Sequence, residues 1–271
     1  MAHYSRILIL GPTGWFGRTA MELSCPSSAR FLLVGSRRGQ LHVGGSTHIV
    51  HEWNEHEVEK FSPDLVLDFA YLTRNWITEL GLSEYRARNE ALAERLVWAA
   101  TLRSVETVVT ISSGAAVQPE LDPYGEGKKN IELTLKEALK TSSTNLGVLR
   151  AWSVSGGFVR EPHQYALSSF VRQGLDSGNI TVSADRKVFR RYCAVEELLA
   201  VGLHLAHKHS HSLLDSGGEK LEILDIAKKV AEQIPGARVI LEHPARDSQG
   251  SDDYSSDNES WVRGIRETRL N

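Results

Sequence analysis

Cysteine is scarce in this chain of 271 residues, and long apolar runs are missing. The only cysteines, Cys25 and Cys193, lie far apart and next to no partner pattern. The spacing leaves one disulfide open, but we expect two unpaired thiols in a reducing compartment. The segment Met1–Gly14 lacks the basic region, apolar run and small-residue cleavage site of a secretion signal. No apolar run approaches the ~20 residues that span a bilayer, so we expect a cytoplasmic protein.

An excess of charge of one sign is also missing. Charged residues make up 24% of the sequence, and the formal net charge is −3. Such a balance provides no basic field for binding nucleic acid or an anionic membrane. Hydrophobic residues make up 41%, which allows one sizeable core, or a large domain followed by a smaller one.

Short apolar runs, each ending at turn residues, recur through the first part of the chain. Runs of this kind suit parallel strands that are buried on both faces. Apolar residues at helical spacing occur between them, in Ser83–Leu102 and Tyr124–Leu139. The alternation predicts an α/β fold with a doubly wound parallel sheet and a ligand site at the carboxyl ends of the strands. The predicted strands are Arg6–Leu10, Phe31–Val34, Leu65–Phe69, Val108–Ile111 and Leu146–Leu149.

The pattern changes after about residue 151. Phe189–Leu205 predicts a short strand that runs into a helix, and Leu221–Ile234 predicts an amphipathic helix. Gly250–Glu259 is polar and rich in Ser and Asp, so we expect a loop there rather than a core element.

A glycine-rich turn directly follows the first predicted strand, in the order Gly11-Pro-Thr-Gly14-Trp-Phe-Gly17. This spacing suits a tight turn, a close approach of the backbone to a diphosphate, and close packing of the next helix on the sheet. The start of that helix provides free N–H groups and a partial positive charge. The turn therefore predicts a dinucleotide-binding Rossmann domain. Its expected cofactor contacts are Gly11, Thr13, Gly14, Trp15, Phe16 and Gly17.

The end of the second predicted strand indicates which dinucleotide is bound. NAD-specific sites carry an acidic residue there, which hydrogen-bonds the adenosine ribose. This chain has Ser36, Arg37 and Arg38 instead. Guanidinium groups and a hydroxyl suit a 2′-phosphate through charge-assisted hydrogen bonds. We therefore favour NADP and keep NAD as an alternative; a solvated basic loop is the other interpretation.

Tyr124 and Lys128 are four residues apart at the start of a predicted helix, which places them on one face. An ammonium near the phenol, together with a positive nicotinamide ring, is expected to lower the pKa of Tyr124 from its usual value near 10. Tyr124 could then exchange a proton at neutral pH. A serine at the end of the fourth strand would orient a carbonyl group, and we assign Ser113, with Ser112 as a substitute.

Together these motifs resemble the short-chain dehydrogenase/reductase superfamily, in particular its extended branch of sugar-nucleotide-modifying enzymes, the NAD-dependent epimerase/dehydratase family. The resemblance implies a hydride transfer at a sugar carbon and a role of the kind found in polysaccharide biosynthesis. It also implies that Phe69, Ala70 and Tyr71 lie near the cofactor and that Arg190 binds the diphosphate of a nucleotide-linked sugar. With the motifs it predicts a dinucleotide-binding domain over 1–152, rejoined by about 182–205, and a mainly substrate-binding lid over 153–271.

The chain departs from the family pattern after Ser113. Sugar dehydratases of the family carry Thr-Asp-Glu in this loop, whereas this chain has Gly114-Ala115-Ala116, so dehydration is disfavoured. The arginines at the second strand favour a dissociable NADPH. We therefore rank an NADP-dependent reductase of a nucleotide-linked keto-sugar ahead of an NAD-dependent epimerase. A non-catalytic dinucleotide-binding regulator is a further alternative, which the intact Tyr124/Lys128 pair disfavours.

Two more features bear on partners. Four histidines between residues 204 and 211 lack a carboxylate or cysteine ligand at a suitable spacing, so we expect a solvated helix end and no metal site. The superfamily resemblance makes a homodimer an open alternative, although no interface is evident in the sequence.

Overall fold

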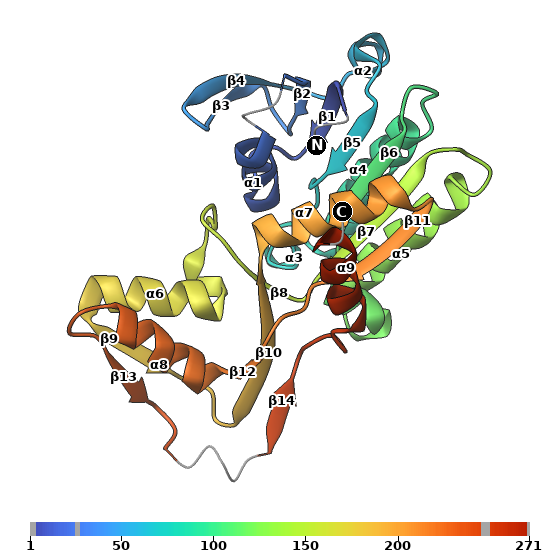
Figure 1. Ribbon diagram of the computed structural model, residues 1–271. Coiled ribbons are helices and arrows are strands. Elements are labelled where there is room, and N and C mark those ends of the chain that lie inside the picture. The colour runs from blue at the N-terminus through green and yellow to red at the C-terminus, as the bar shows by residue number, and fades with distance from the viewer. Residues whose placement is uncertain (1–3, 25–27, 245–249, 270–271) are drawn as a thin grey trace.

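The computed structural model describes residues 4–24, 28–244 and 250–269. A sheet of eight strands runs through its larger part (Figure 1), in the order β11-β7-β6-β5-β1-β2-β4-β3. All neighbours in it are parallel except β3 and β4, which form an antiparallel hairpin. The strands are β1 (Arg6–Leu10), β2 (Arg30–Val34), β3 (Gly39–Val43), β4 (Ser46–His51), β5 (Leu65–Asp68), β6 (Thr107–Ser113), β7 (Asn145–Ala151) and β11 (His211–Asp215).

Helices cover both faces of this sheet, because successive side chains of a strand point to opposite faces. In β1, Ile7 and Ile9 pack with one set of helices, and Leu8 and Leu10 pack with the other set. The first set is α1 (Trp15–Ser24), α7 (Val195–Lys208) and α9 (Glu259–Arg269). The second set is α2 (Glu55–Phe61), α4 (Leu82–Ala100) and α5 (Pro123–Ala138). The short helix α3 (Trp76–Leu80) precedes α4.

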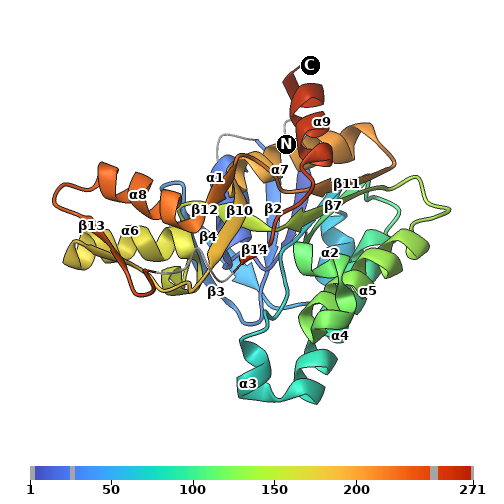
Figure 2. The same ribbon diagram turned by 90° about the horizontal axis from the view of Figure 1, so that it is seen from below.

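The remaining elements form a smaller unit with its own apolar cluster. Strand β10 (Lys187–Ala194) pairs with β8 (Ser153–Ser155), β12 (Lys220–Glu222) and β14 (Ser251–Asp253). Strands β9 (Asn179–Val182) and β13 (Arg238–Leu241) pair with each other. A turn of 3-10 helix, η3 (Pro162–Gln164), precedes α6 (Ala166–Ser177), and α8 (Ile223–Gln233) packs beside α6. Figure 2 shows α6 and α8 together, on the opposite side of the molecule from α4 and α5.

This architecture confirms the predicted fold class, a Rossmann-type doubly wound sheet. The chain returns to the large sheet after β10, because α7 follows it directly and β11 pairs with β7. The division of the chain into a dinucleotide-binding and a substrate-binding domain stays a prediction. Cys193 is a buried free thiol, and Cys25 lies outside the described residues.

The tail prediction is wrong in part. We expected a loop over Gly250–Glu259, but Ser251–Asp253 pairs in parallel with Lys187–Phe189. Backbone pairing at a sheet edge requires no apolar side chains, so composition gave no signal for this strand. Just beyond it, the buried hydroxyl of Ser256 donates to the Ser216 carbonyl oxygen at 2.9 Å.

Candidate functional site

The glycine turn joins β1 to α1 and has room for a diphosphate. Gly11 has φ +74°, and a Cβ there would lie 2.8 Å from the backbone of Phe69 and Ala70. A Cβ at Gly17 would lie 2.4 Å from the Gly11 carbonyl oxygen. At Gly14 the nearest atom would be 3.6 Å away, an ordinary contact, so a Cβ there would not clash with the protein. The first and third glycines therefore close the turn, and the second leaves its backbone accessible.

Aromatic rings flank the turn. The ring of Phe16 stacks on that of Phe69 with centroids 6.3 Å apart, and the ring of Trp15 meets that of Tyr165 edge-on at 5.2 Å. The Trp15 Nε1 is buried and has no hydrogen-bond partner among the described residues. A buried donor without a partner carries a desolvation cost, which an anionic ligand in this place would remove. The room beside Gly14 and this indole N–H both fit a dinucleotide diphosphate.

The residues predicted to select the dinucleotide lie at the carboxyl end of β2. Ser36, Arg37 and Arg38 are all exposed there. The end of β2 is next to the turn, because the Gly11 N–H donates to the Val34 carbonyl oxygen at 2.9 Å. The Arg38 N–H donates to the Glu52 carboxylate at 3.3 Å.

The two serines at the end of β6 point to different partners. Ser112 donates to the Glu132 carboxylate at 2.6 Å. The Ser113 hydroxyl accepts the Ala115 N–H at 3.2 Å, which caps the 3-10 helix η1 (Gly114–Val117), and it lies near enough to the Tyr124 phenol to lower the pKa of that phenol. Gly114 has no room for a side chain, since a Cβ would lie 2.3 Å from the Trp152 ring. Of the serine candidates, only Ser113 therefore has its hydroxyl at Tyr124.

Tyr124 lies at the start of α5, after a second 3-10 turn, η2 (Pro119–Leu121). Asp122 caps the helix by accepting the N–H groups of Tyr124 and Gly125 at 2.8 and 3.0 Å. Arg74 pairs with Asp122 at 3.0 Å and lies 5.4 Å from the Tyr124 ring centroid. Burial raises the pKa of Tyr124 to about 12, although the hydrogen bond with Ser113 opposes the rise. Lys128 is not among the groups that shift this pKa most, so the lowering that we expected from its ammonium is not seen, and burial is the largest influence.

Lys128 is buried inside the protein. The neighbours of its ammonium are a backbone carbonyl group and the ring of another tyrosine, rather than the phenol of Tyr124. The Nζ donates to the Ile111 carbonyl oxygen at 2.7 Å and lies 4.0 Å from the centroid of the Tyr71 ring. That ring is 5.7 Å from the Tyr124 ring, centroid to centroid. Burial lowers the pKa of Lys128 to about 8, while Asp68 and Glu132 hold it up.

A buried ion pair supports α5 from behind. Arg150 donates from Nε and Nη2 to the two carboxylate oxygens of Glu132 at 2.7 and 2.6 Å. Burial raises the pKa of Glu132, but hydrogen bonds from Arg150 and Ser112 outweigh it and leave this pKa lowered. Charge-assisted bidentate contacts of this kind fix geometry strongly, so they hold α5 against the ends of β6 and β7.

Arg190 lies on β10, and the ring of Tyr254 lies between its guanidinium and the Ser113–Tyr124 pair. Its guanidinium is 5.6 Å from the Tyr254 ring and 3.1 Å from the Asp252 carboxylate. The Tyr254 ring packs 4.9 Å from that of Trp152, and its phenol lies near enough to Ser113 for that serine to lower the pKa of the phenol. The predicted substrate residue therefore lies close to the Ser113–Tyr124 pair.

The sequence analysis missed three contributors to this region. Tyr254 lies in the tail that we expected to be a loop, Arg74 follows β5, and Trp152 directly follows β7. No motif marks the first two, because their place depends on how β14 and α3 fold back. The sequence could have predicted only the helix start at this place, because Asp122 before Pro123 is a pattern typical of a helix N-cap.

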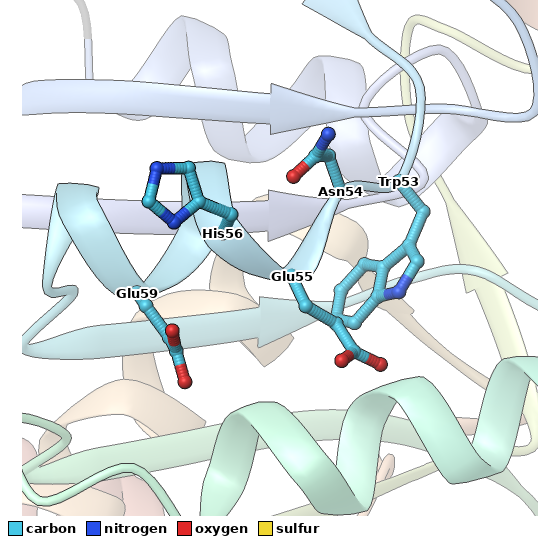
Figure 3. Close-up of a pocket in the computed structure, with 5 residues that line it drawn as sticks. All are labelled: Trp53, Asn54, Glu55, His56 and Glu59. Carbon is cyan, nitrogen blue, oxygen red and sulfur yellow. The ribbon is translucent and has the colours of Figure 1, made fainter.

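Other features of the described residues stay outside this site. Figure 3 shows a surface pocket at the start of α2, where Trp53 and Glu55 lie side by side. Asn54 accepts the Glu57 N–H there at 3.1 Å and so caps the helix. Across residues 4–24, 28–244 and 250–269 no cluster of three or more His, Cys, Asp or Glu could hold a metal. In the same ranges no helix has both the length and the apolar character to cross a membrane.

A family model described as "Polysaccharide biosynthesis protein" matches residues 50–248, well over half of the chain. The chain belongs to this family. Membership in this family confirms the resemblance to the extended branch of the short-chain dehydrogenase/reductase superfamily. No curated protein sequence matches the chain.

Solved structures agree with the fold at low sequence identity. "MoeE5 in complex with UDP-glucose and NAD" has a TM-score of 0.72 and 20% identity, covering 95% of this chain and 91% of that one. The NAD-dependent NDP-hexosamine 5,6-dehydratase TunA has a TM-score of 0.73 and 20% identity, with coverages of 96% and 91%. A UDP-N-acetylglucosamine 4-epimerase from Methanobrevibacter ruminantium has a TM-score of 0.73 and 16% identity, with coverages of 97% and 96%. The names of these three structures describe a protein bound to UDP-glucose and NAD, a dehydratase and an epimerase, and at these identities the likeness shows the fold.

Proposed function

We propose that this chain is an epimerase that acts on a nucleotide-diphosphate sugar and uses a nicotinamide dinucleotide as its cofactor. The observation that carries the proposal is the Ser113 hydroxyl at the carboxyl end of β6, which acts on the Tyr124 phenol, together with Lys128, which is buried one turn further along α5 and donates to the Ile111 carbonyl oxygen of β6. Family membership and the ligands in the names of the similar structures support the substrate class, a uridine diphosphate sugar.

When bound, the dinucleotide would supply the redox chemistry, the transfer of a hydride between its ring and a carbon of the sugar. Gly11, Gly14 and Gly17 would form the cradle for its diphosphate, with the Trp15 indole N–H as a further donor. The ring of Phe69 and the backbone of Ala70, which contact the turn, would fix the position of that cradle.

The chain's own groups would handle the proton. Ser113 would orient the sugar oxygen, and Tyr124 would take the proton from it or return it. Positive charge at Lys128 would stabilise the phenolate that forms when the proton has left Tyr124. Arg190 would bind a substrate phosphate through its guanidinium.

The test is turnover by Tyr124→Phe. Purified protein is incubated with a uridine diphosphate sugar, with and without added dinucleotide, and the sugar epimers are separated by chromatography. We expect Tyr124→Phe to lose about 10²–10⁴-fold in rate, the usual contribution of general acid–base catalysis. Tyr4→Phe is the matched control, because its phenol bonds Thr107 at the opposite end of β6. Full turnover by Tyr124→Phe would refute the assignment.

One observation favours a second candidate, a reductase that uses NADPH. The end of β2 carries Ser36, Arg37 and Arg38 rather than a carboxylate, and burial keeps the Tyr124 phenol protonated, as a proton donor to a carbonyl requires. Mass spectrometry of the nucleotide that co-purifies separates the two candidates, since an epimerase retains NAD. Binding of either dinucleotide without turnover of any sugar would instead favour a regulator.

A further inference from the structure

Arg74 lies in the loop between β5 and α3, over the ring of Tyr124. Its guanidinium carbon is 5.4 Å from the ring centroid, and its Nη2 lies 3.0 Å from the Asp122 carboxylate. More than half of the Arg74 side chain is exposed. A guanidinium has five N–H donors. Within residues 4–24, 28–244 and 250–269, Asp122 is the one group that accepts a hydrogen bond from it, so donors remain for a ligand that reaches Tyr124.

Stability gives no reason for this placement of Arg74. An ion pair between exposed side chains contributes little to folding. The start of α5 does not need the arginine either, because Asp122 accepts two N–H groups of the first turn without it. A comparable pair occurs one turn along α5, where Arg86 lies 2.6 Å from Glu126 and both side chains are about half exposed. No ring of the described residues lies under Arg86, so the position over Tyr124 distinguishes Arg74.

The loop that carries Arg74 is also held from the smaller unit. The side-chain amide of Asn75 donates to the side-chain oxygen of Gln164, at the end of η3. The next residue, Tyr165, has its ring against that of Trp15. A loop that is already held in place loses less conformational freedom when a ligand binds to it. Arg74 is therefore positioned in advance, where the smaller unit meets the start of α5.

A second guanidinium, that of Arg190, lies 5.6 Å from the Tyr254 ring and has been assigned to a substrate phosphate. Arg74 comes from a different element and lies over the phenol ring on which the proposed proton transfer depends. In that reaction the sugar, rather than the diphosphate, has to reach Tyr124. A cation at this ring therefore acts on the sugar. A guanidinium binds a planar carboxylate through two parallel N–H groups, and hexuronic acids carry such a group.

We propose that the substrate is an acidic sugar, a nucleotide-diphosphate hexuronate, and that Arg74 selects it by binding its carboxylate. The inference rests on the proposed function, because it takes Tyr124 to act on the sugar of such a nucleotide. The exposed pair with Asp122 is weak, so the guanidinium can turn to a ligand at little cost. A hydrogen bond to a charged group is worth about 10–100-fold in affinity. Arg74 should separate an acidic from a neutral sugar by about this factor.

The test compares UDP-glucuronate with UDP-glucose, which differ in carrying a carboxylate or a hydroxymethyl group at one carbon of the sugar. Calorimetric titrations with NAD added use the full chain with Tyr124→Phe, which keeps the ring beneath Arg74 and slows turnover. We expect about 10–100-fold tighter binding of UDP-glucuronate. Adding Arg74→Met should remove this preference and leave the affinity for UDP-glucose unchanged. Arg74→Lys should retain part of the preference, since it keeps the charge and loses the fork.

Two further variants separate carboxylate binding from other effects of charge. Arg86→Met removes an exposed cation that also pairs with an acid of α5, and it should leave the preference in place. Arg190→Met should weaken UDP alone and both UDP-sugars by similar factors. Arg74→Met should leave the affinity for UDP alone unchanged.

Equal affinity for the two sugars in the Tyr124→Phe chain would overturn the inference, as would a preference that survives Arg74→Met. With Tyr124 intact, Arg74→Met should raise the KM for UDP-glucuronate by about 10–100-fold with little change in kcat. An Arg74-dependent preference in a protein that turns over neither sugar would uphold this inference and refute the epimerase. Turnover of UDP-glucose without any such preference would do the opposite.

Discussion

Two glycines of the same turn should respond to alanine in opposite ways. At Gly17 a Cβ would lie 2.4 Å from the Gly11 carbonyl oxygen and 2.6 Å from the Pro12 Cα, which are backbone atoms that cannot rotate away. Such overpacking costs about 1–3 kcal/mol, against which the better helix propensity of alanine returns up to about 1 kcal/mol. At Gly14 the nearest atom would be 3.6 Å away, an ordinary contact.

Contacts this short with backbone atoms place the cost at the upper end, so the net loss is about 2 kcal/mol. We therefore expect Gly17→Ala to lower the melting temperature by about 4–8 °C, at about 2–4 °C per kcal/mol for a chain of this size. Gly14→Ala should keep the melting temperature and lose dinucleotide affinity, because its methyl group would occupy the room beside Gly14 that we assign to the diphosphate. Differential scanning calorimetry and fluorescence titration with NAD and NADP measure the two effects. Unchanged melting of Gly17→Ala would refute the packing argument, and wild-type affinity of Gly14→Ala would refute the place assigned to the diphosphate.

Three further outcomes follow from buried and exposed charges. Arg150→Met should cost about 3–5 kcal/mol in denaturant unfolding because it leaves a buried carboxylate unpaired, whereas Arg172→Ala, at an exposed pair, should cost under about 1 kcal/mol. Burial raises the pKa of Asp64, but its hydrogen bonds outweigh burial and hold this pKa below 3.8. The wild-type protein should therefore be more stable than Asp64→Asn above about pH 4. This difference in the free energy of unfolding should vanish as the pH falls through the pKa of Asp64 in the folded protein. Replacing Arg37 and Arg38 together by alanine should weaken NADP binding more than NAD binding if NADP is the cofactor, and equal effects would exclude that preference.

The strands were predictable because each buried parallel strand is a short apolar run. Arg6–Leu10 has the predicted bounds, and β5 and β2 differ from the prediction by one residue at one end. The glycine turn was predictable from its spacing after β1, although the steric demand on Gly11 comes from the distant backbone of Phe69 and Ala70. The apolar runs depend on neighbours in sequence, which is why one sequence sufficed for the strands.

Features that depend on distant segments were not predictable. The partners of Lys128 are a carbonyl of β6, a ring that follows β5 and a carboxylate of β5, so residue spacing on α5 could not identify them. The pKa of Tyr124 depends on how completely the surrounding chain excludes water, and sequence spacing carries no measure of that. The arginines after β2 predicted NADP from local charge alone, and this choice of cofactor stays a prediction; two of the similar structures are named with NAD.

The last segment of the chain has a consequence for how the site is assembled. Tyr254 reaches Ser113 only after β14 has paired with β10, and α9 then packs on α7. During synthesis the ribosome releases these residues after the whole Rossmann sheet has emerged. A nascent chain could thus fold its glycine turn while Tyr254 is still missing from the Ser113–Tyr124 region, and that ring would be added once β14 has emerged and paired with β10.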